Sequence, residues 1–398
     1  MSAAIILGPD VTSSLASLTQ RPNEWPIARS RIQALRLYAQ ELYQDESANA
    51  AGGVGENYFP KLVEDGFFAQ IAAWGLPLDL EAPFVKSGWG CNGVEPLRLT
   101  QLALERARSV GCPIRNVSAD EPLLAECGTW QDRADMTARN IAMLRVNGQH
   151  NIDLTFAFRA NTAAQIVAFT ERVQQLGHDT GTWTSPTGMD IDFDPYSLHD
   201  QLGNQAEQVG GAELRDLQAH CRAWGIPFRV IPTTRGDTPQ AYHDGILNCI
   251  GLIRQLLGGD PDAYILESWE GVPGGLPVNL AETDPLSHTA LVNDVSRLIG
   301  KDDNMQWADV TVQTTATGTV LVNGDGTVRS LNPSSATPPY GPYHWESRPA
   351  GTDGGYERCA INGATVAYNP VGETVAFAFQ ATIPNKPGMS SISIEPLQ

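Results

Sequence analysis

The stretch ELRDLQAHCRAWGIPFRVI, residues 213–231, places a helix, its end and a strand in direct succession. Apolar residues recur at helical spacing, which predicts an amphipathic helix over Glu213–Trp224. Gly225 can take the left-handed conformation that closes a helix, and Pro227 cannot extend one. The short apolar run Phe228–Ile231 then predicts a buried strand. This order is typical of an α/β protein in which helices and parallel strands alternate.

The same helix ending occurs twice more, at Trp74-Gly75-Leu76-Pro77 and at Val110-Gly111-Cys112-Pro113. Helical periodicity is also clear over Leu97–Val110 and Thr162–Leu176. Short apolar runs between the helical patterns predict eight strands before about residue 300. These runs are Ala3–Leu7, Ala34–Gln40, Leu76–Leu80, Ile114–Ala119, Ile152–Phe158, Met189–Phe193, Phe228–Ile231 and Ala263–Leu266.

Eight successive strand–helix units either close into a barrel or wind into an open sheet. An open dinucleotide-binding sheet should carry a G-x-G-x-x-G turn after its first strand. The turn here is Gly8-Pro9-Asp10-Val11, which lacks that pattern. We therefore predict a (β/α)₈ TIM barrel over residues 1–302, and we expect it to be the catalytic domain.

The pattern changes after residue 302. Val310–Val322 alternates apolar and polar residues, and Asn323–Gly326 is typical of a hairpin turn. Ala364–Tyr368 and Thr374–Gln380 predict further strands. We expect residues 303–398 to form a small all-β, sandwich-like accessory domain.

Composition limits the classes of partner. The chain has 398 residues, a formal net charge of −19 and 42% hydrophobic residues, which is typical of a folded acidic protein. This charge disfavours nucleic acid and an anionic membrane surface, because both are bound through Lys and Arg. No apolar run is long enough to span a bilayer, and no signal peptide is visible, so we expect a cytoplasmic protein by default. Export without a cleaved signal stays open, and the sequence does not give the oligomeric state.

Six cysteines are scattered without a C-x-x-C pair, and the seven histidines show no HExxH spacing. This disfavours a zinc site, so we expect no metal and no cofactor. Buried free thiols are the expected state of the cysteines, with one disulfide among Cys91, Cys112 and Cys127 as the alternative.

Carboxylates follow several predicted strands, although Asp and Glu are depleted from strands in general. In a barrel, groups at the carboxyl ends of the strands gather at one opening, the mouth, where catalysis takes place. A pair of carboxylates can divide acid and base work between them. The candidate catalytic residues are Glu121, Glu267, Asp192 and Asp194.

Other residues of the same strand ends and loops are candidates for substrate binding. Aromatic side chains can stack on sugar rings, so aromatic residues in these loops are included. Trp183 also lies in or near these loops. Each carboxylate has an alternative structural role, as a helix cap or as the partner of a basic side chain such as Lys86 for Glu81. The candidates are Glu81, Asp120, Asp190, Trp269, Trp89, Tyr196, Arg159 and Arg235.

Two short motifs resemble known families. Asp120-Glu121-Pro122 resembles the Asn-Glu-Pro that ends strand four in a large clan of retaining barrel glycoside hydrolases. The resemblance implies that Glu121 is the acid/base and Glu267 the nucleophile, although Asp replaces Asn and Glu267 follows the eighth predicted strand. Gly188–Asp194 is similar to the DGxDxDxE strand of chitinase-like barrels, with Thr187 and Asp194 at the first Asp and the final Glu.

The sequence therefore predicts a glycoside hydrolase that acts on an oligo- or polysaccharide through two carboxylates. One alternative is a non-catalytic glycan-binding protein of a phage or cell surface. A second alternative is a metal-dependent lyase or phosphodiesterase that uses Asp190, Asp192 and Asp194 to hold a cation such as Ca²⁺ or Mg²⁺.

Overall fold

The structure is a computed structural model. It describes residues 3–9, 14–46, 56–86, 91–158, 160–181, 183–234, 238–267 and 279–300, and the backbone of the strands beyond them. The chain divides into two compact units, Met1–Ile299 and Gly300–Gln398.

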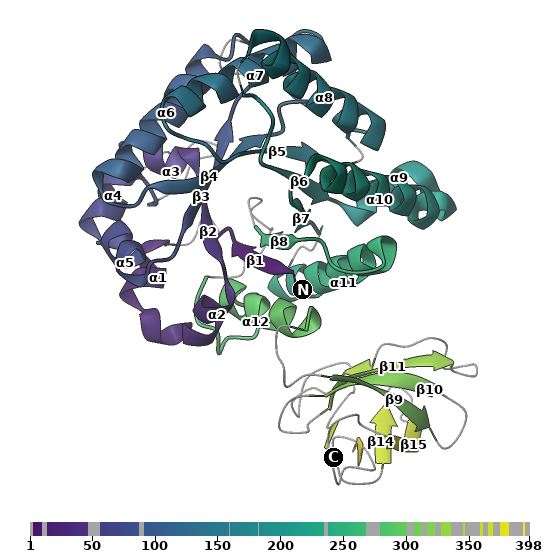
Figure 1. The fold of residues 1–398 in the computed structure, drawn as a ribbon. Helices are drawn as coiled ribbons and strands as arrows, with labels where there is room; N and C mark the ends of the chain where they lie inside the picture. The colour runs from purple at the N-terminus through teal and green to yellow at the C-terminus, as the bar shows by residue number, and fades with distance from the viewer. Residues whose placement is uncertain are drawn as a thin grey trace. The chain divides into compact units, whose positions relative to one another are not determined.

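The first unit is a closed barrel of eight parallel strands in the order β1 to β8 (Figure 1). The barrel closes where β1 pairs with β8. This confirms the predicted TIM barrel and all eight predicted strands, although the predicted range of the third strand lies two residues too early. The strands are β1 (Ala4–Leu7), β2 (Ala34–Tyr38), β3 (Leu78–Pro83), β4 (Ile114–Asp120), β5 (Ile152–Ala157), β6 (Gly188–Phe193), β7 (Phe228–Pro232) and β8 (Ala263–Leu266).

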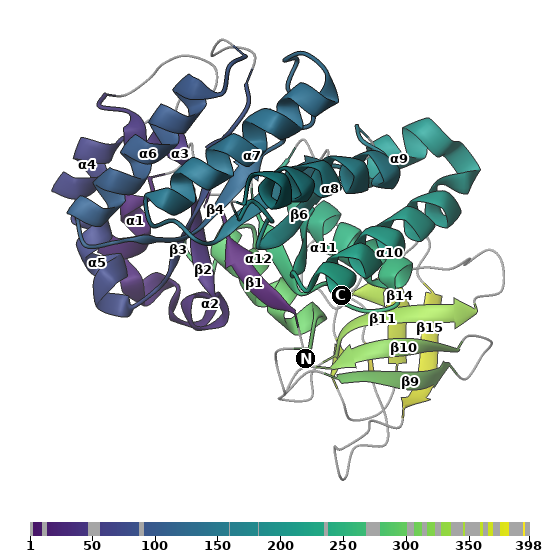
Figure 2. The same ribbon diagram turned by 45° about the horizontal axis from the view of Figure 1, so that its top comes forward.

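Helices surround the strands on the outside of the barrel (Figures 1 and 2). Gly75, Gly111 and Gly225 all have φ between 63° and 76°, so the three predicted helix endings do use left-handed glycines. The helices are α1 (Ala16–Gln20), α2 (Pro26–Arg31), α3 (Ala39–Tyr43), α4 (Phe59–Glu64), α5 (Phe67–Trp74), α6 (Val94–Ser109), α7 (Trp130–Val146), α8 (Ala163–Thr180), α9 (Pro195–Leu202), α10 (Ala206–Trp224), α11 (Pro239–Leu257) and α12 (His288–Leu298).

The strands present different chemistry on their two faces. Residues that face the helices, such as Leu35, Val117 and Leu154, are fully buried in one large apolar core. On the inner face, a small apolar cluster includes Ile6 of β1 and Ile265 of β8. The inner faces of β2 to β7 instead carry buried charged and hydroxyl side chains, which are described below. The interior is therefore polar on one side, and these groups lead up to the mouth.

The second unit consists of β-strands. A six-stranded sheet has the order β12-β11-β10-β9-β15-β14, and β13 pairs with β16. β10 and β11 pair antiparallel, as the predicted hairpin requires, and the predicted turn Asn323–Gly326 lies outside the described residues. The sandwich-like packing stays a prediction. The strands are β9 (Gln306–Val312), β10 (Thr317–Val322), β11 (Val328–Ser335), β12 (Trp345–Glu346), β13 (Cys359–Ala360), β14 (Thr365–Tyr368), β15 (Val375–Ala381) and β16 (Ser393–Ile394).

Candidate active site at the barrel mouth

One buried arginine lies below the mouth and contacts several carboxylates. Arg36 of β2 is fully buried, and its Nη2 donates to Asp190 Oδ2. Its Nη1 lies 3.4 Å from Glu81 Oε2 and 3.3 Å from Glu267 Oε1. Carboxylates of β3, β6 and the end of β8 thus converge on one guanidinium. Glu81 thus has the ion-pair partner of its alternative structural role, but this partner is Arg36, while Lys86 pairs with Asp120.

Asp190 is fully paired inside the barrel. It accepts from Arg229 Nε at 2.6 Å and from Ser118 Oγ at 2.9 Å, in addition to Arg36. Burial alone would raise the pKa of Asp190, but Arg229 and Arg36 outweigh it and hold the pKa below 3.8. Asp190 therefore stays ionised and paired, which fits its alternative role as a core residue satisfied by arginine and speaks against substrate binding.

Glu267 lies directly after β8, and its side chain is completely buried. Apart from the long ion pair with Arg36, neither of its carboxyl oxygens has a hydrogen-bond partner among the residues that the structure describes. Burial raises its pKa to about 7, because Arg36 offsets only part of the burial and the charges of Asp190 and Asp192 add to it. Glu267 is thus a buried carboxyl group whose pKa lies near neutral pH.

Asp192 of β6 has a similar environment. It accepts a hydrogen bond from Thr233 Oγ1. Burial raises its pKa to about 7, and the charges of Glu121, Asp194 and Asp120 add to this, while the Thr233 bond lowers it. The mouth therefore holds a second carboxyl group that changes charge near neutral pH.

Glu121 follows β4 in a strained backbone conformation. Its φ of 39° lies in the left-handed region, which non-glycine residues rarely adopt, and such strain is common at functional sites. Burial and the neighbouring Asp120 raise the pKa of Glu121, and Lys86 partly offsets this. Lys86 Nζ lies 2.5 Å from Asp120 Oδ2, so Asp120 is its partner. Glu121 is left as a partly buried acid beside an ion pair.

The described contacts give Asp194 a structural role. It is the N-cap of α9, where Oδ1 accepts from Tyr196 N at 2.8 Å and Oδ2 from Ser197 Oγ at 2.5 Å. This satisfies backbone donors at the helix start. Asp190 pairs with arginines and Asp194 caps a helix, so these contacts speak against a metal site built from Asp190, Asp192 and Asp194. Among the residues that the structure describes, no cluster of His, Cys, Asp or Glu could hold a metal ion.

A disulfide joins the two loops that carry Lys86 and Glu121. Cys91, after β3, is bonded to Cys127, after β4, with 4.9 Å between their Cα atoms. Of the outcomes left open, the single disulfide is therefore present. Cys112, Cys221 and Cys249 are buried free thiols, as expected.

Three residues of the site are not among the candidates predicted from the sequence, which are polar and aromatic residues at the strand ends and in the loops that follow. Arg36 lies within the apolar run ALRLY, and a lone charge in such a strand was the available signal. Tyr38, also on β2, has a buried hydroxyl without a hydrogen-bond partner. Burial raises the pKa of Tyr38, as do the charges of Glu267 and Glu81. The third is Gly8, and its contact with Glu267 has no signal in the sequence.

Several predicted residues are not part of this cluster. Trp183 precedes β6 at the opposite end of the barrel, where the Arg145 guanidinium lies 3.7 Å from its ring centre, so its placement near the mouth was wrong. Tyr196 is 46% exposed at the start of α9, on the side of the mouth. Four predicted residues lie outside the described part of the chain, namely Trp89, Trp269, Arg159 and Arg235.

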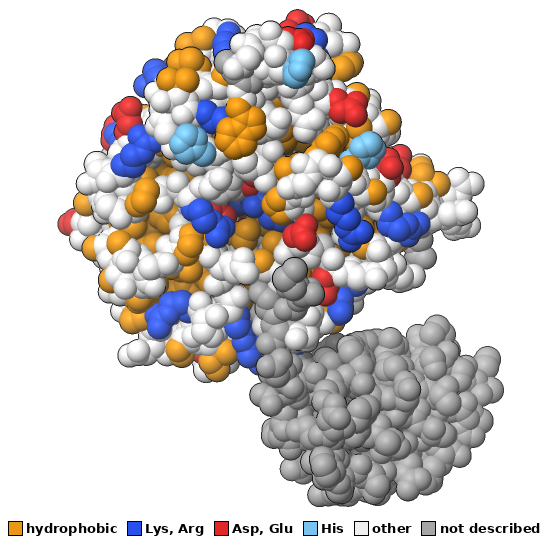
Figure 3. Space-filling view, in the orientation of Figure 1, with side chains coloured by type: hydrophobic (Ala, Val, Ile, Leu, Met, Phe, Trp, Pro, Cys, Tyr) orange, Lys and Arg blue, Asp and Glu red, His pale blue; other side chains and the backbone are white. Residues whose placement is uncertain are grey.

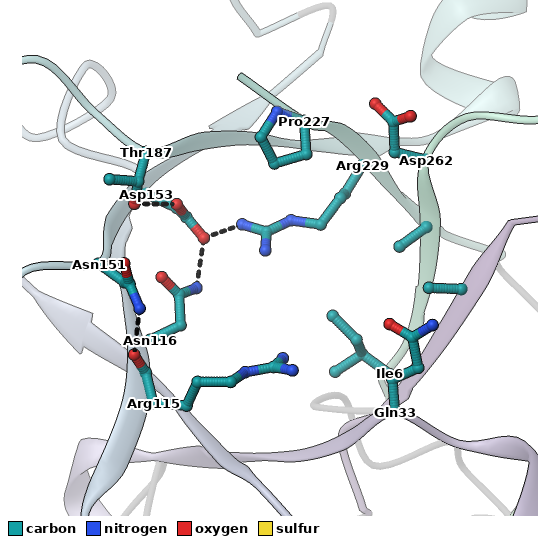
Figure 4. Close-up of a pocket in the computed structure, with 12 residues that line it drawn as sticks. Ile6, Gln33, Arg115, Asn116, Asn151, Asp153, Thr187, Pro227, Arg229 and Asp262 are labelled. Atoms are coloured by element: carbon teal, nitrogen blue, oxygen red, sulfur yellow. Dashed lines mark hydrogen bonds and ion pairs between the residues drawn. The ribbon is translucent and has the colours of Figure 1, made fainter. Parts of the chain in front are cut away.

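A cavity of about 290 Å³ lies at the opposite end of the barrel, where the strands begin (Figure 4). Several of its polar groups already have hydrogen-bond partners. Asp153 accepts from Arg229, Asn116 and Thr187, and Arg115 pairs with Asp79. The mouth, in contrast, holds Glu267, whose carboxyl oxygens accept no hydrogen bond from the described residues. We therefore take the mouth as the candidate active site.

The chain matches no protein-family model and no curated protein. It is similar to solved barrel structures at low identity. A structure of fungal β-1,4-galactanases has 12% identity and a TM-score of 0.46, and covers 74% of this chain and 99% of its own. A GH30 endoxylanase from Clostridium papyrosolvens has 12% identity and a TM-score of 0.45, with 100% and 94% covered.

Other barrel enzymes are similar to about the same degree. A D-allulose 3-epimerase from Methylomonas has 11% identity and a TM-score of 0.41, and covers 76% of this chain and 98% of its own. These likenesses extend across different chemistries and concern the fold alone. The eight parallel strands show that the first unit of this chain is a TIM barrel.

Proposed function

We propose that the barrel is a glycoside hydrolase with its active site at the mouth. The observation that carries the proposal is the pair Asp192 and Glu267, two buried carboxyl groups whose pKa values are raised to about 7. Glu121, whose pKa is also raised, lies close enough to Asp192 for their charges to interact. Acid and base work at neutral pH requires carboxyl groups with such raised pKa values.

The surroundings suggest a division of roles. Glu121 is the proton donor to the leaving oxygen, because it is only partly buried and no arginine of the described residues holds it ionised. Glu267 is the nucleophile or base, because Arg36 stabilises its charged form. Burial and the negative charge of Asp120 raise the pKa of Glu121 and so tune the acid, and the charge of Glu121 acts in turn on Asp192. The distance between the two reacting carboxyl groups determines whether the configuration is retained or inverted.

We propose a neutral saccharide as the substrate, since a mouth rich in carboxylates repels anions. Glu81 and Asp120 border the same cluster, and the exposed ring of Tyr196 offers a stacking surface. Trp89, Trp269, Arg159 and Arg235 stay predicted contacts. In Figure 3 the basic side chains are scattered over the visible face of the barrel, without the continuous patch typical of nucleic-acid binding. No described helix is long and apolar enough to cross a membrane.

The second unit, Gly300–Gln398, is proposed as an accessory domain of this enzyme. The Cys91–Cys127 disulfide is typical of oxidising compartments, which favours export over the cytoplasmic default.

The test is product release from a broad glycan panel, followed by mass spectrometry, with wild type and Glu121→Gln in parallel. We expect product from the wild type and a loss of at least ~100-fold in the variant, whose fold and glycan binding are retained. Binding without product from the wild type would instead support the glycan-binding alternative. Full activity of Glu121→Gln would show that Glu121 is not the acid.

A further inference from the structure

Gly8 lies at the end of β1, between Glu267 and β2. Its N–H donates to Leu266 O at 2.8 Å, which holds the end of β1 against the end of β8. A Cβ atom built on Gly8 would lie 2.3 Å from Glu267 Cγ, 3.2 Å from Cδ and 3.3 Å from Cβ. The Glu267 side chain thus occupies the space that any other residue at position 8 would fill.

The requirement for glycine at this position is spatial. Gly8 is not one of the described residues with positive φ, so its backbone conformation is open to any L-residue. A 2.3 Å approach between carbon atoms is far inside van der Waals contact. The atom that approaches is Cγ, close to the Glu267 backbone, so rotation at the tip of the side chain would not relieve the contact.

The open space lets Glu267 reach across β1 to β2. In this position its Oε1 lies 3.3 Å from Arg36 Nη1, and its charge acts on the buried hydroxyl of Tyr38. The strand pairing explains the reach, because Leu7 pairs with Leu266 on one side and with Leu35 on the other. Residue 8 therefore separates Glu267 from Arg36, and only a residue without a side chain leaves the path open.

We infer that Gly8 is a positioning residue for Glu267. Because Gly8 has no side chain, the Glu267 carboxyl group can occupy its buried position beside Arg36. The catalytic consequence rests on the proposed function, in which Glu267 is the nucleophile or base. The geometric claim stands without it. No other residue type at position 8 is compatible with this placement.

The direct test is Gly8→Ala in the full chain. The new methyl group displaces Glu267 from Arg36 toward the open mouth. Because misplacement of a reacting group by about 1 Å can cost ~100-fold in rate, we expect kcat to fall by about that factor with KM little changed. Burial is the main cause of the raised Glu267 pKa, so we expect this pKa to fall from about 7 toward 4.5.

The pKa of Glu267 is measured by NMR on protein with ¹³C-labelled glutamate carboxyl groups, with the signal assigned by its absence in Glu267→Gln. On the substrate found in the glycan screen, the acidic limb of the pH–rate profile should move down with it. Gly251→Ala is the matched control, because a Cβ at Gly251 in α11 meets nothing within 4 Å. We expect this control to keep wild-type kcat and Glu267 pKa.

A second background separates positioning from a general defect in folding. Gly8→Ala should lower the thermal unfolding midpoint when Glu267 is present. It should cause a clearly smaller loss in Glu267→Ala, where the 2.3 Å approach to Cγ is gone and only the 3.3 Å approach to Cβ remains. Equal losses in the two backgrounds, or an unchanged Glu267 pKa in Gly8→Ala, would overturn the inference. If the wild type releases no product, the proposed function fails, while the NMR and unfolding measurements still decide the role of Gly8.

Discussion

Replacing Asp192 with asparagine removes one negative charge from the mouth and keeps the shape of the side chain. The asparagine carbonyl can still accept the hydrogen bond that Thr233 Oγ1 donates to Asp192. The charges that act on Asp192, those of Glu121, Asp194 and Asp120, are all negative. The substitution should therefore stabilise the barrel wherever the wild-type aspartate is forced to ionise.

The size of the effect follows from the two pKa values of Asp192, about 7 in the folded protein and 3.8 in an ordinary environment. Since the folded pKa is the higher, the wild type loses stability as the pH rises from 3.8 through 7. The values differ by about three, and one pKa unit corresponds to ~1.4 kcal/mol, so the full difference is up to about 4 kcal/mol. We expect Asp192→Asn to match the wild type near pH 4 and to exceed it by up to that amount at pH 8.

The assay is urea denaturation from pH 4 to pH 8, followed by circular dichroism at the helical wavelength. All described helices belong to the barrel unit, so this signal reports barrel unfolding. Asp132→Asn is a control of opposite sign, because hydrogen bonds from Thr129 lower the pKa of Asp132, and its loss should destabilise the protein at neutral pH. An Asp192→Asn variant no more stable than wild type at pH 8 would refute the reasoning.

Three further predictions concern the supports of the site. Arg36→Met leaves three carboxylates without their shared cation and should cost at least ~3 kcal/mol of unfolding free energy at pH 8; an unchanged thermal midpoint would contradict this. Cys91 and Cys127 should appear as one linked pair in a non-reduced peptide map, and alkylation of either thiol before reduction would exclude the pair. Replacing both with serine should lower the unfolding free energy from urea denaturation by ~3–4 kcal/mol. Burial and the nearby His243 lower the pKa of His288 to about 4, so the unfolding free energy should fall by up to about 3 kcal/mol as the pH drops from 6.5 through 4. His288→Gln should remove this pH dependence in the same urea assay.

Much of the fold is encoded in short, local stretches of the sequence. Each strand is an apolar run and several helices end at a left-handed glycine, so the eight units and their order follow from spacing alone. The closure of the barrel followed from counting these units and from the absence of a dinucleotide-binding turn at Gly8. The mouth was predictable for the same reason, because it lies where parallel strands end.

The individual roles within the mouth depend on contacts between distant segments, which spacing does not encode. Asp190 and Asp192 are two residues apart on one face. Asp190 pairs with Arg36 and Arg229, whereas among the described residues Asp192 accepts from Thr233 and otherwise faces like charges. Asp194 follows the strand directly and is the N-cap of α9. The space above Gly8 is visible only once β8 lies beside β1.

The most direct test of the central claim is turnover by Glu267→Gln, measured by mass spectrometry on the glycan that the wild type cleaves. Asn116→Ala, in the cavity at the opposite end of the barrel, is the matched control. If the mouth is the active site, Glu267→Gln keeps its fold and loses at least ~100-fold in kcat, while Asn116→Ala keeps cleaving the glycan. Wild-type turnover by Glu267→Gln, or a loss confined to Asn116→Ala, would contradict the account.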